Sequence, residues 1–172
     1  MVRRGLLAGA LALVLAPPAV AGYHPVVKTP PITDPRGFIA MTYRKMAADS
    51  GYLPPEDIFT PHLQSLFDDE RRDSPKGELG RYDFCFWINA QEWDIKGDII
   101  VTAEPVEGNT GRQVITAKFV SIGKAVELHF YFERIGHRWL IDDVRSALPD
   151  LWTLSTLLKY GYDGPVTPGA GF

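Results

Sequence analysis

The chain has 172 residues, of which 45% are hydrophobic and 23% are charged. These proportions are typical of one globular domain and exclude a disordered or collagen-like chain. The formal net charge of −3 at pH 7 is unfavourable for a general nucleic-acid or anionic-membrane binder. The single cysteine, Cys85, excludes an internal disulfide framework and a zinc site built from several cysteines.

Residues 1–21 have the three parts of a secretory signal peptide. Arg3 and Arg4 precede an apolar run over residues 6–15, and a small-residue site ends at Ala21. A membrane-spanning helix needs about 20 apolar residues, and this run has about half that length. We therefore expect cleavage after Ala21 and a periplasmic or secreted protein without stable membrane insertion. Arg3 and Arg4 leave both the general and the twin-arginine export routes open.

The mature chain is expected to form one domain over residues 34–161. An extended lead-in over residues 22–33 contains three prolines, which disfavour a helix. Residues 162–172 are broken by glycine and proline and are predicted to be a flexible tail.

Two helix starts carry the same signal, a capping residue followed by proline. Asp34 and Pro35 predict a first helix that ends before Gly51, and Thr60 and Pro61 predict a second one. The apolar stripes expected to face the core are Ile39, Tyr43, Met46 and Ala47 in the first helix, and Phe59, Leu63, Leu66 and Phe67 in the second.

The segment over residues 74–94 is punctuated by proline and glycine, yet it is rich in aromatic residues. A loop this apolar must pack onto other parts of the protein. We expect Cys85 within it to be a small apolar core residue, because cysteine is among the most buried residue types.

From Ile95 onward the hydrophobic period changes to two, which predicts four antiparallel strands joined by short turns. Turns at Gly123-Lys124 and Gly136-His137 would each fix a register. The pairs expected on the apolar face are Phe132–Ile141, Phe130–Asp143, Phe119–Leu128, Ala117–Phe130, Ile115–Phe132, Ile99–Phe119, Val101–Ala117 and Ala103–Ile115, with Val106 opposite Arg112 across a five-residue loop.

A last helix is expected after Pro149, capped by Asp150 and ended by Gly161. Its stripe would be Leu151, Leu154, Leu157 and Leu158. The predicted fold class is α+β: two N-terminal helices, an aromatic loop, a curved four-stranded antiparallel meander and a C-terminal helix.

Several stretches resemble a bacterial exported family called domain of unknown function 3828. They include the helix over residues 35–46, the loop over 78–84, the stretch over 89–94 and the ending over 139–144. That family is similar to the nuclear transport factor 2-like superfamily, which includes ketosteroid isomerase-like and SnoaL-like proteins. The resemblance implies a cystatin-like cone in which helices wrap a curved sheet. The superfamily contains both enzymes and binding modules, so a shared fold leaves the function open.

Asp143 is the first candidate site residue, because the expected register puts it at the end of an apolar row. A desolvated carboxylate has a raised pKa and suits a general base or a ligand contact. Tyr43 of the first helix would lie near it in a small-molecule cavity. Two alternatives stay open: a β-bulge near Asp142 that turns Val144 inward and leaves Asp143 solvated, and an ion pair with Arg145.

The aromatic segment over residues 82–93 is the second candidate, because its mixture of aromatic and polar residues is found at recognition surfaces. The preferred interpretation is that the segment plugs the open end of a cone, because it is long and needs burial. The full set of candidate ligand or partner residues is Tyr43, Asp83, Trp87, Gln91, Trp93, Asp94, Trp139 and Asp143.

No metal or cofactor is expected. His129 and Glu127 are two residues apart, as on any solvated strand face, and no phosphate loop, dinucleotide fingerprint or Gly-x-Ser-x-Gly elbow occurs in the sequence. The leading hypothesis is a non-enzymatic exported module that binds a small apolar or amphipathic ligand or another exported protein. The alternatives are a cofactor-free isomerase or hydro-lyase with Asp143 as base, and an inhibitor or immunity-type protein. We expect a monomer or a weak homodimer, because the outer sheet face is acidic.

Overall fold

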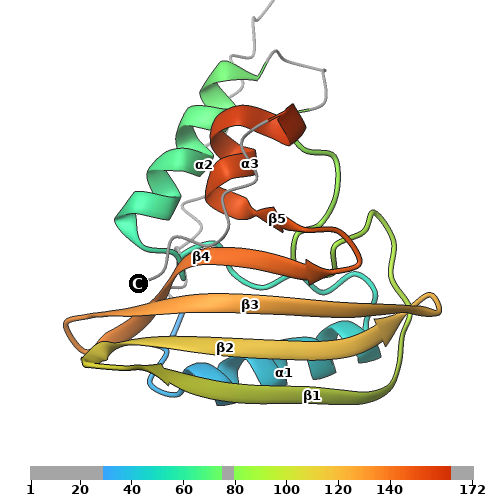
Figure 1. Ribbon diagram of the computed structural model, residues 1–172, viewed down its shortest axis with the longest axis horizontal. Coiled ribbons are helices and arrows are strands. Elements are labelled where there is room, and N and C mark those ends of the chain that lie inside the picture. The colour runs from blue at the N-terminus through green and yellow to red at the C-terminus, as the bar shows by residue number, and fades with distance from the viewer. Residues whose placement is uncertain (1–28, 75–79, 164–172) are drawn as a thin grey trace, which may run out of the picture.

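The computed structural model describes residues 29–74 and 80–163. They form three α-helices and a five-stranded antiparallel sheet of order β1-β2-β3-β4-β5 (Figure 1). The helices are α1 (Pro35–Ala48), α2 (Pro61–Asp73) and α3 (Leu154–Tyr160), and a short 3-10 turn, η1, covers Gly161–Asp163. The strands are β1 (Ile95–Val106), β2 (Asn109–Ser121), β3 (Lys124–Ile135), β4 (Arg138–Leu148) and β5 (Trp152–Thr153). The predicted α+β class is confirmed, with one strand more than expected.

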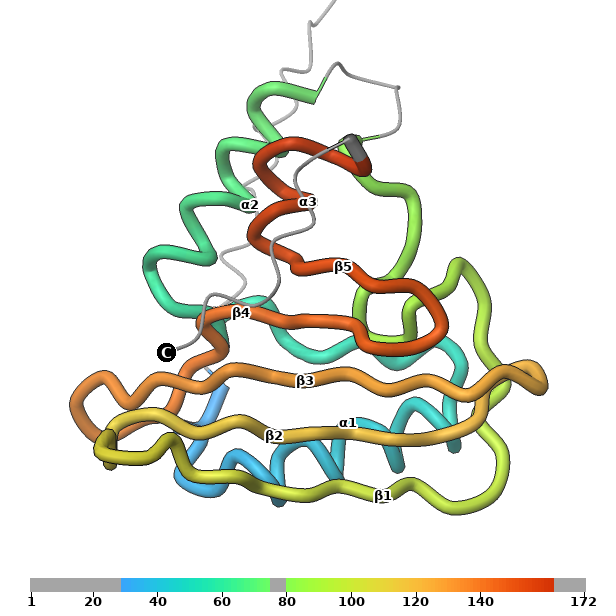
Figure 2. Tube along the Cα trace, in the orientation of Figure 1, coloured from blue at the N-terminus to red at the C-terminus, as the bar shows by residue number. Residues whose placement is uncertain are grey.

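The helices cover the sheet in two groups. Helix α1 lies across one face of the sheet, while α2 and α3 lie side by side beyond β4 (Figures 1 and 2). The main core fills the space between α1 and the sheet, and its fully buried residues include Ile39, Tyr43, Ile115, Leu128, Phe130 and Val144.

Both predicted capping signals are confirmed. The Asp34 carboxylate accepts a hydrogen bond from the Gly37 backbone N–H, and the Thr60 hydroxyl accepts one from the Leu63 N–H. These bonds satisfy N–H groups that have no partner within the helix. One stripe residue was wrong: Ala47 is exposed, and Thr42 is buried in its place.

The β1–β2 register agrees with the expectation over its middle. Val101 lies opposite Ala117 and Ala103 opposite Ile115, as predicted. The turn is tighter than the expected five-residue loop, because Val106 pairs with Asn109 and not with Arg112. A register shift between Pro105 and Val106 separates this pair from the rest of the ladder. A second irregularity lies between Lys96 and Ile100, so the expected Ile99–Phe119 pair does not form.

The β2–β3 register differs from the prediction by two residues. The turn is formed by Ile122 and Gly123, with φ angles of 47° and 73°, and not by Gly123-Lys124. Phe119 therefore pairs with Val126, where Leu128 was expected. The same shift replaces the other two expected pairs with Ala117–Leu128 and Ile115–Phe130. Because strand side chains alternate with a period of two, every residue nevertheless keeps its predicted face.

The β3–β4 hairpin closes on Gly136-His137 and pairs Phe132 with Ile141, as predicted. Beyond that pair a register shift inserts one extra residue, Asp142, into β4. Phe130 consequently pairs with Val144, which is fully buried, and Asp143 lies opposite Tyr131. The expected Phe130–Asp143 pair was wrong. The bulge that stood as its alternative is present and turns Val144 inward, but Asp143 is partly buried and not left solvated as that alternative expected.

The last helix begins later than predicted. Trp152 and Thr153 pair with β4 as the short strand β5, so α3 starts at Leu154 and Asp150 is not its cap. Leu151 is consequently exposed. Gly161 ends the helix as expected, with a φ of 69°.

The ends of the described chain are held by specific contacts. Ile32 of the predicted lead-in is buried and forms a β-bridge with Trp139. Tyr162, predicted to begin the tail, lies in η1 and donates its hydroxyl proton to Asp83. The predicted signal peptide, lead-in residues 22–28 and tail residues 164–172 lie outside the described residues. Among the residues described, no helix has both the length and the apolar character needed to cross a membrane.

Candidate functional site

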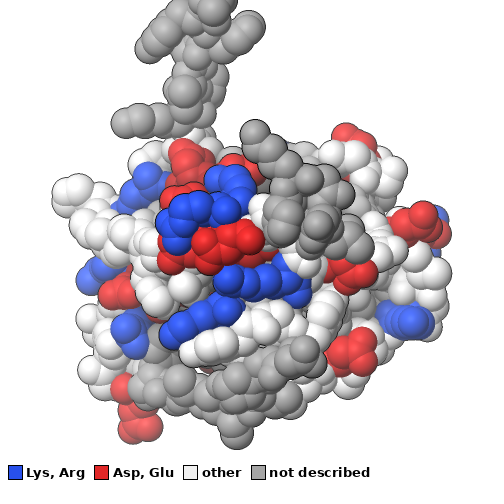
Figure 3. Space-filling model, turned by 90° about the horizontal axis from the view of Figure 1, so that it is seen from above, with Lys and Arg blue, Asp and Glu red and all other residues white. Residues whose placement is uncertain are grey.

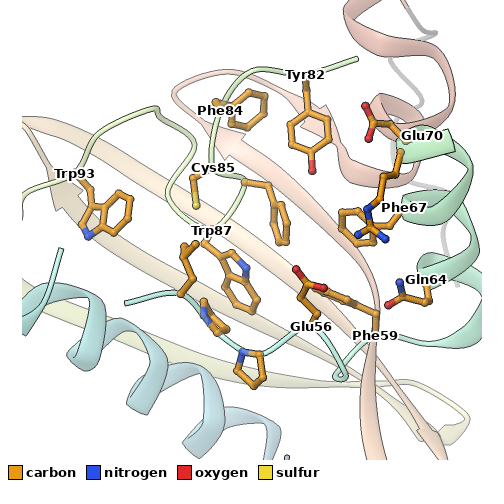
Figure 4. Close-up of a pocket in the computed structure, with 15 residues that line it drawn as sticks. Glu56, Phe59, Gln64, Phe67, Glu70, Tyr82, Phe84, Cys85, Trp87 and Trp93 are labelled. Atoms are coloured by element: carbon orange, nitrogen blue, oxygen red, sulfur yellow. The ribbon is translucent and has the colours of Figure 1, made fainter. Parts of the chain in front are cut away.

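A cavity of about 530 Å³ opens between α2, the loop before it and the aromatic segment over residues 82–93. We call it the aromatic cleft (Figure 4). It is lined by Leu53, Pro54, Pro55, Glu56, Phe59, Gln64, Phe67, Glu70, Arg71, Tyr82, Phe84, Cys85, Phe86, Trp87 and Trp93. Small-molecule sites have volumes of about 300–1,000 Å³ and are mainly apolar with a few polar groups, as this cleft is.

Three chain segments supply the aromatic wall. Phe59 precedes α2 and Phe67 lies on it, with their ring centroids 5.0 Å apart. Phe86 of the aromatic segment lies 6.2 Å from Phe59 and 6.0 Å from Phe67. These separations fall within the range of favourable aromatic pairs. The wall is therefore a set of rings that hold one another in place.

The aromatic segment is fixed to the core beneath the cleft. The Trp87 ring stacks on Phe130 of β3 at a centroid distance of 5.1 Å. The fully buried Tyr43 hydroxyl donates a 2.6 Å hydrogen bond to the Trp87 carbonyl oxygen. Burial raises the pKa of Tyr43 well above its usual value, so this phenol stays a neutral donor. Tyr43 thus supports the cleft from below.

Glu70 connects α2 to the start of the aromatic segment. Its Oε1 accepts hydrogen bonds from the Ser74 hydroxyl at 2.9 Å and from the Arg81 backbone N–H at 3.0 Å. Burial, followed by the nearby Glu70 charge, raises the pKa of Tyr82 to about 12. Tyr82 therefore presents a neutral phenol to the cleft at physiological pH.

Cys85 lines the cleft and is half-buried. The residue forms a β-bridge with Ala90 that closes a tight loop. Desolvation raises the pKa of the thiol, so it is protonated at neutral pH. A protonated thiol is a weak nucleophile. The sequence predicted a core residue, but Cys85 is only partly buried and packs against the core from the cleft lining.

Four of the predicted site residues lie at or beside the cleft. Trp87 and Trp93 line it, and the Trp93 indole N–H donates to the Met46 carbonyl at 3.2 Å. Asp83 and Gln91 line an adjoining hollow of about 410 Å³. There the Gln91 amide donates to the Asp83 carbonyl oxygen at 3.1 Å.

Two other predicted residues lie away from the cleft lining. Asp94 is exposed and forms an ion pair of 2.9 Å with Lys96. Trp139 packs against the core and beneath the Arg134 guanidinium, 5.7 Å from its ring centroid. Tyr43 does not line the cleft either, but its hydroxyl supports the cleft residue Trp87 by donating to the Trp87 carbonyl oxygen.

Among the described residues, those that line the cleft do not include Asp143. Its Oδ1 accepts from the backbone N–H groups of Val144, at 2.8 Å, and Ser155, at 3.0 Å. Its Oδ2 accepts from the Ser155 hydroxyl at 2.5 Å. Burial raises the pKa of Asp143, and the Ser155 and Val144 hydrogen bonds oppose that rise. Three protein donors thus occupy the carboxylate that the sequence offered as a candidate base or ligand contact.

The extra residue of the bulge, Asp142, contacts the N-terminus of α2. The Asp142 carboxylate accepts a 2.8 Å hydrogen bond from the hydroxyl of Thr60, the N-cap of α2. The side chain of Thr153, the N-cap residue of α3, accepts no hydrogen bond from the helix. The Asp143 carboxylate on β4 accepts one from the Ser155 backbone N–H instead. The two consecutive aspartates therefore anchor the N-termini of two neighbouring helices, where a negative charge is favourable.

Sequence reasoning missed the loop before α2. Leu53, Pro55 and Glu56 line the cleft, but the sequence identifies them only as a proline-rich connector. The one available signal was that the aromatic segment needs an apolar partner. Composition does not indicate which connector provides it.

The outer sheet face is a polar network. Glu127 accepts from Lys118 at 3.0 Å and contacts His129 at 3.0 Å, and the Lys118 hydrogen bond is the main cause of its lowered pKa. Within the described part of the chain, no three His, Cys, Asp or Glu side chains are grouped so that they could hold a metal ion.

Comparisons of the chain with protein families, curated proteins and solved structures give no match.

Proposed function

We propose that this protein is an exported, non-enzymatic domain that binds a small apolar or amphipathic molecule in the aromatic cleft. The observation that carries the proposal is the cavity of about 530 Å³ lined by seven aromatic side chains. A cleft of this size and character is the default binding site of a domain. The residues over 1–21 support export, because they have the composition of a signal peptide.

The use of Asp143 as a base draws less support, because its oxygens already accept three hydrogen bonds from Val144 and Ser155. An interface centred on exposed tryptophans also draws less support, since Trp87 is only 4% exposed. We also propose membership of the nuclear transport factor 2-like superfamily, which is supported by the antiparallel sheet with α1 across one face and with α2 and α3 beyond β4 (Figure 2).

The neutral fluorescent dye N-phenyl-1-naphthylamine tests the proposal. Leu53 lines the cleft and is 58% exposed, so Leu53→Asp places a charge in the wall with little effect on folding. Leu151 is 48% exposed and does not line the cleft, so Leu151→Asp is the matched control. We expect saturable one-to-one binding to the wild type and to Leu151→Asp, and binding at least about tenfold weaker to Leu53→Asp. No saturable binding, or equal binding to the two variants, would refute the proposal.

A further inference from the structure

The aromatic cleft combines ring faces with an excess of negative charge, which selects among the ligands that the proposed function allows. Three ionisable carboxylate or guanidinium side chains line the cleft: Glu56, Glu70 and Arg71. An aromatic ring attracts a cation to its face through its quadrupole, and a nearby carboxylate adds to that attraction.

Among the described residues, the two carboxylates have no lysine or arginine side chain as a partner. In residues 29–74 and 80–163, neither Glu56 nor Glu70 forms an ion pair with a lysine or arginine. The hydrogen bonds that Glu70 accepts come from the Ser74 hydroxyl and a backbone N–H, which are both neutral donors. Two carboxylates and one guanidinium line the cleft, so acidic groups outnumber basic groups there by one.

The basic residues of α2 are already paired with other acids. Arg71 lies 3.4 Å from Asp68, and Arg72 lies 2.9 Å from Asp69. From above, basic and acidic side chains are interleaved on this part of the surface (Figure 3). Arg71 itself lines the cleft, and its guanidinium is shared with Asp68, which does not line it.

The carboxylates lie beside the rings that would receive the cation. Glu56 comes from the loop before α2 and Glu70 from α2, and in Figure 4 both are drawn among the rings of the cleft. Glu70, Arg71 and Tyr82 all line the cleft, where the Glu70 charge raises the pKa of Tyr82 and the Arg71 charge lowers it.

We propose that the aromatic cleft recognises an organic cation, an amine or quaternary ammonium group carried on an apolar body. This inference rests on the proposed function and names the ligand class for the same site. It accounts for the seven aromatic rings together with the two carboxylates that form no ion pair among the described residues, whereas an uncharged apolar ligand accounts only for the rings.

Displacement of N-phenyl-1-naphthylamine by three matched probes tests the inference. The probes are phenyltrimethylammonium, its uncharged isostere tert-butylbenzene, and the anion benzenesulfonate. We expect the cation to bind at least about tenfold more tightly than the isostere, and the anion to bind most weakly. Added salt should weaken only the cation's binding appreciably, because partly exposed charges are screened.

Charge-neutralising variants show which carboxylates contribute to binding of the cation. Glu56→Gln and Glu70→Gln should each weaken binding of phenyltrimethylammonium by about threefold and leave tert-butylbenzene unchanged. Glu104 lies exposed on β1 and does not line the cleft, so Glu104→Gln is the matched control and should change neither probe.

The two proposals fail in different ways. If the dye binds but the cation and its isostere displace it equally well, the cation inference is overturned and the proposed function stands. If the dye does not bind the wild type, both are overturned. If Glu104→Gln weakens the cation as much as Glu56→Gln and Glu70→Gln do, the effect comes from net charge and the inference is again overturned.

Discussion

Asp143 in β4 accepts two hydrogen bonds from Ser155, one from its backbone N–H at 3.0 Å and one from its hydroxyl at 2.5 Å. Ser155 lies in the first turn of α3, whose own N-cap residue provides no side-chain acceptor. The carboxylate therefore replaces the missing cap from a neighbouring strand. Asp143 is thus assigned a structural role that its sequence context alone does not reveal.

The first prediction concerns that anchor. Asp143→Ala leaves the donors of Val144 and Ser155 without their acceptor, so we expect the free energy of unfolding at pH 7 to fall by about 1–3 kcal/mol. Asp143→Asn retains a side-chain oxygen and should lose less. Chemical denaturation of both variants provides the measurement. An unchanged stability in Asp143→Ala would show that the carboxylate does not hold α3.

The second prediction concerns pH. The pKa of Asp143 is raised above 3.8 in the folded protein, chiefly by burial, so the folded state binds a proton more tightly than the unfolded state. Stability must then fall as pH rises from the unfolded pKa to the folded pKa, and stay constant above it. Measured from about pH 3 to pH 7, the stability of the wild type should decline relative to that of Asp143→Asn. A relative gain over this range would contradict the assignment.

The third prediction concerns Thr60, whose hydroxyl bonds both Asp142 and the Leu63 N–H. Thr60→Ala removes the cap and should destabilise the protein by about 1–2 kcal/mol. In a double-mutant cycle with Asp142→Ala, we expect a coupling of at least about 0.5 kcal/mol. Thr60→Ser keeps the hydroxyl and is the control. Strict additivity would indicate that the bulge does not anchor α2.

The fourth prediction concerns the support beneath the cleft. Tyr43→Phe leaves the buried Trp87 carbonyl without its donor and should reduce stability by about 1–3 kcal/mol. Because Trp87 lines the cleft, the variant should also bind N-phenyl-1-naphthylamine more weakly. Tyr160, which is exposed, gives the matched variant Tyr160→Phe, which should alter neither quantity. A fully stable Tyr43→Phe protein with weakened dye binding would argue that Tyr43 contacts the ligand directly.

The parts of the fold that follow local chemistry could be predicted from the sequence. Asp34-Pro35 and Thr60-Pro61 begin helices because the cap and the proline act within one turn. The Gly136-His137 turn was identifiable for the same reason. Ile122 in a left-handed turn conformation was not, since a β-branched residue rarely adopts a positive φ.

The candidate site depends on contacts between distant segments, so the sequence predicted only part of it. The aromatic segment was identified by composition, but its partners Leu53 and Glu56 come from a connector with no distinctive pattern. The expected Phe130–Asp143 pair was wrong because one extra residue in β4, Asp142, reverses which side chain faces inward. A hydrophobic pattern alone does not determine where such a bulge occurs.

The central claim, that the aromatic cleft is a small-molecule site, is tested most directly at Cys85. This residue is the only cysteine of the chain, and it lines both the cleft and the adjoining hollow, so its reaction with the neutral reagent 4,4′-dithiodipyridine reports on access to these two spaces. Labelling is measured at pH 8 with and without saturating N-phenyl-1-naphthylamine, and the denatured protein provides the control for direct effects of the dye. We predict that the bound dye slows labelling of the folded protein and leaves the denatured protein unaffected. Saturable dye binding with an unchanged labelling rate would show that the bound dye does not cover Cys85, and it would contradict the account.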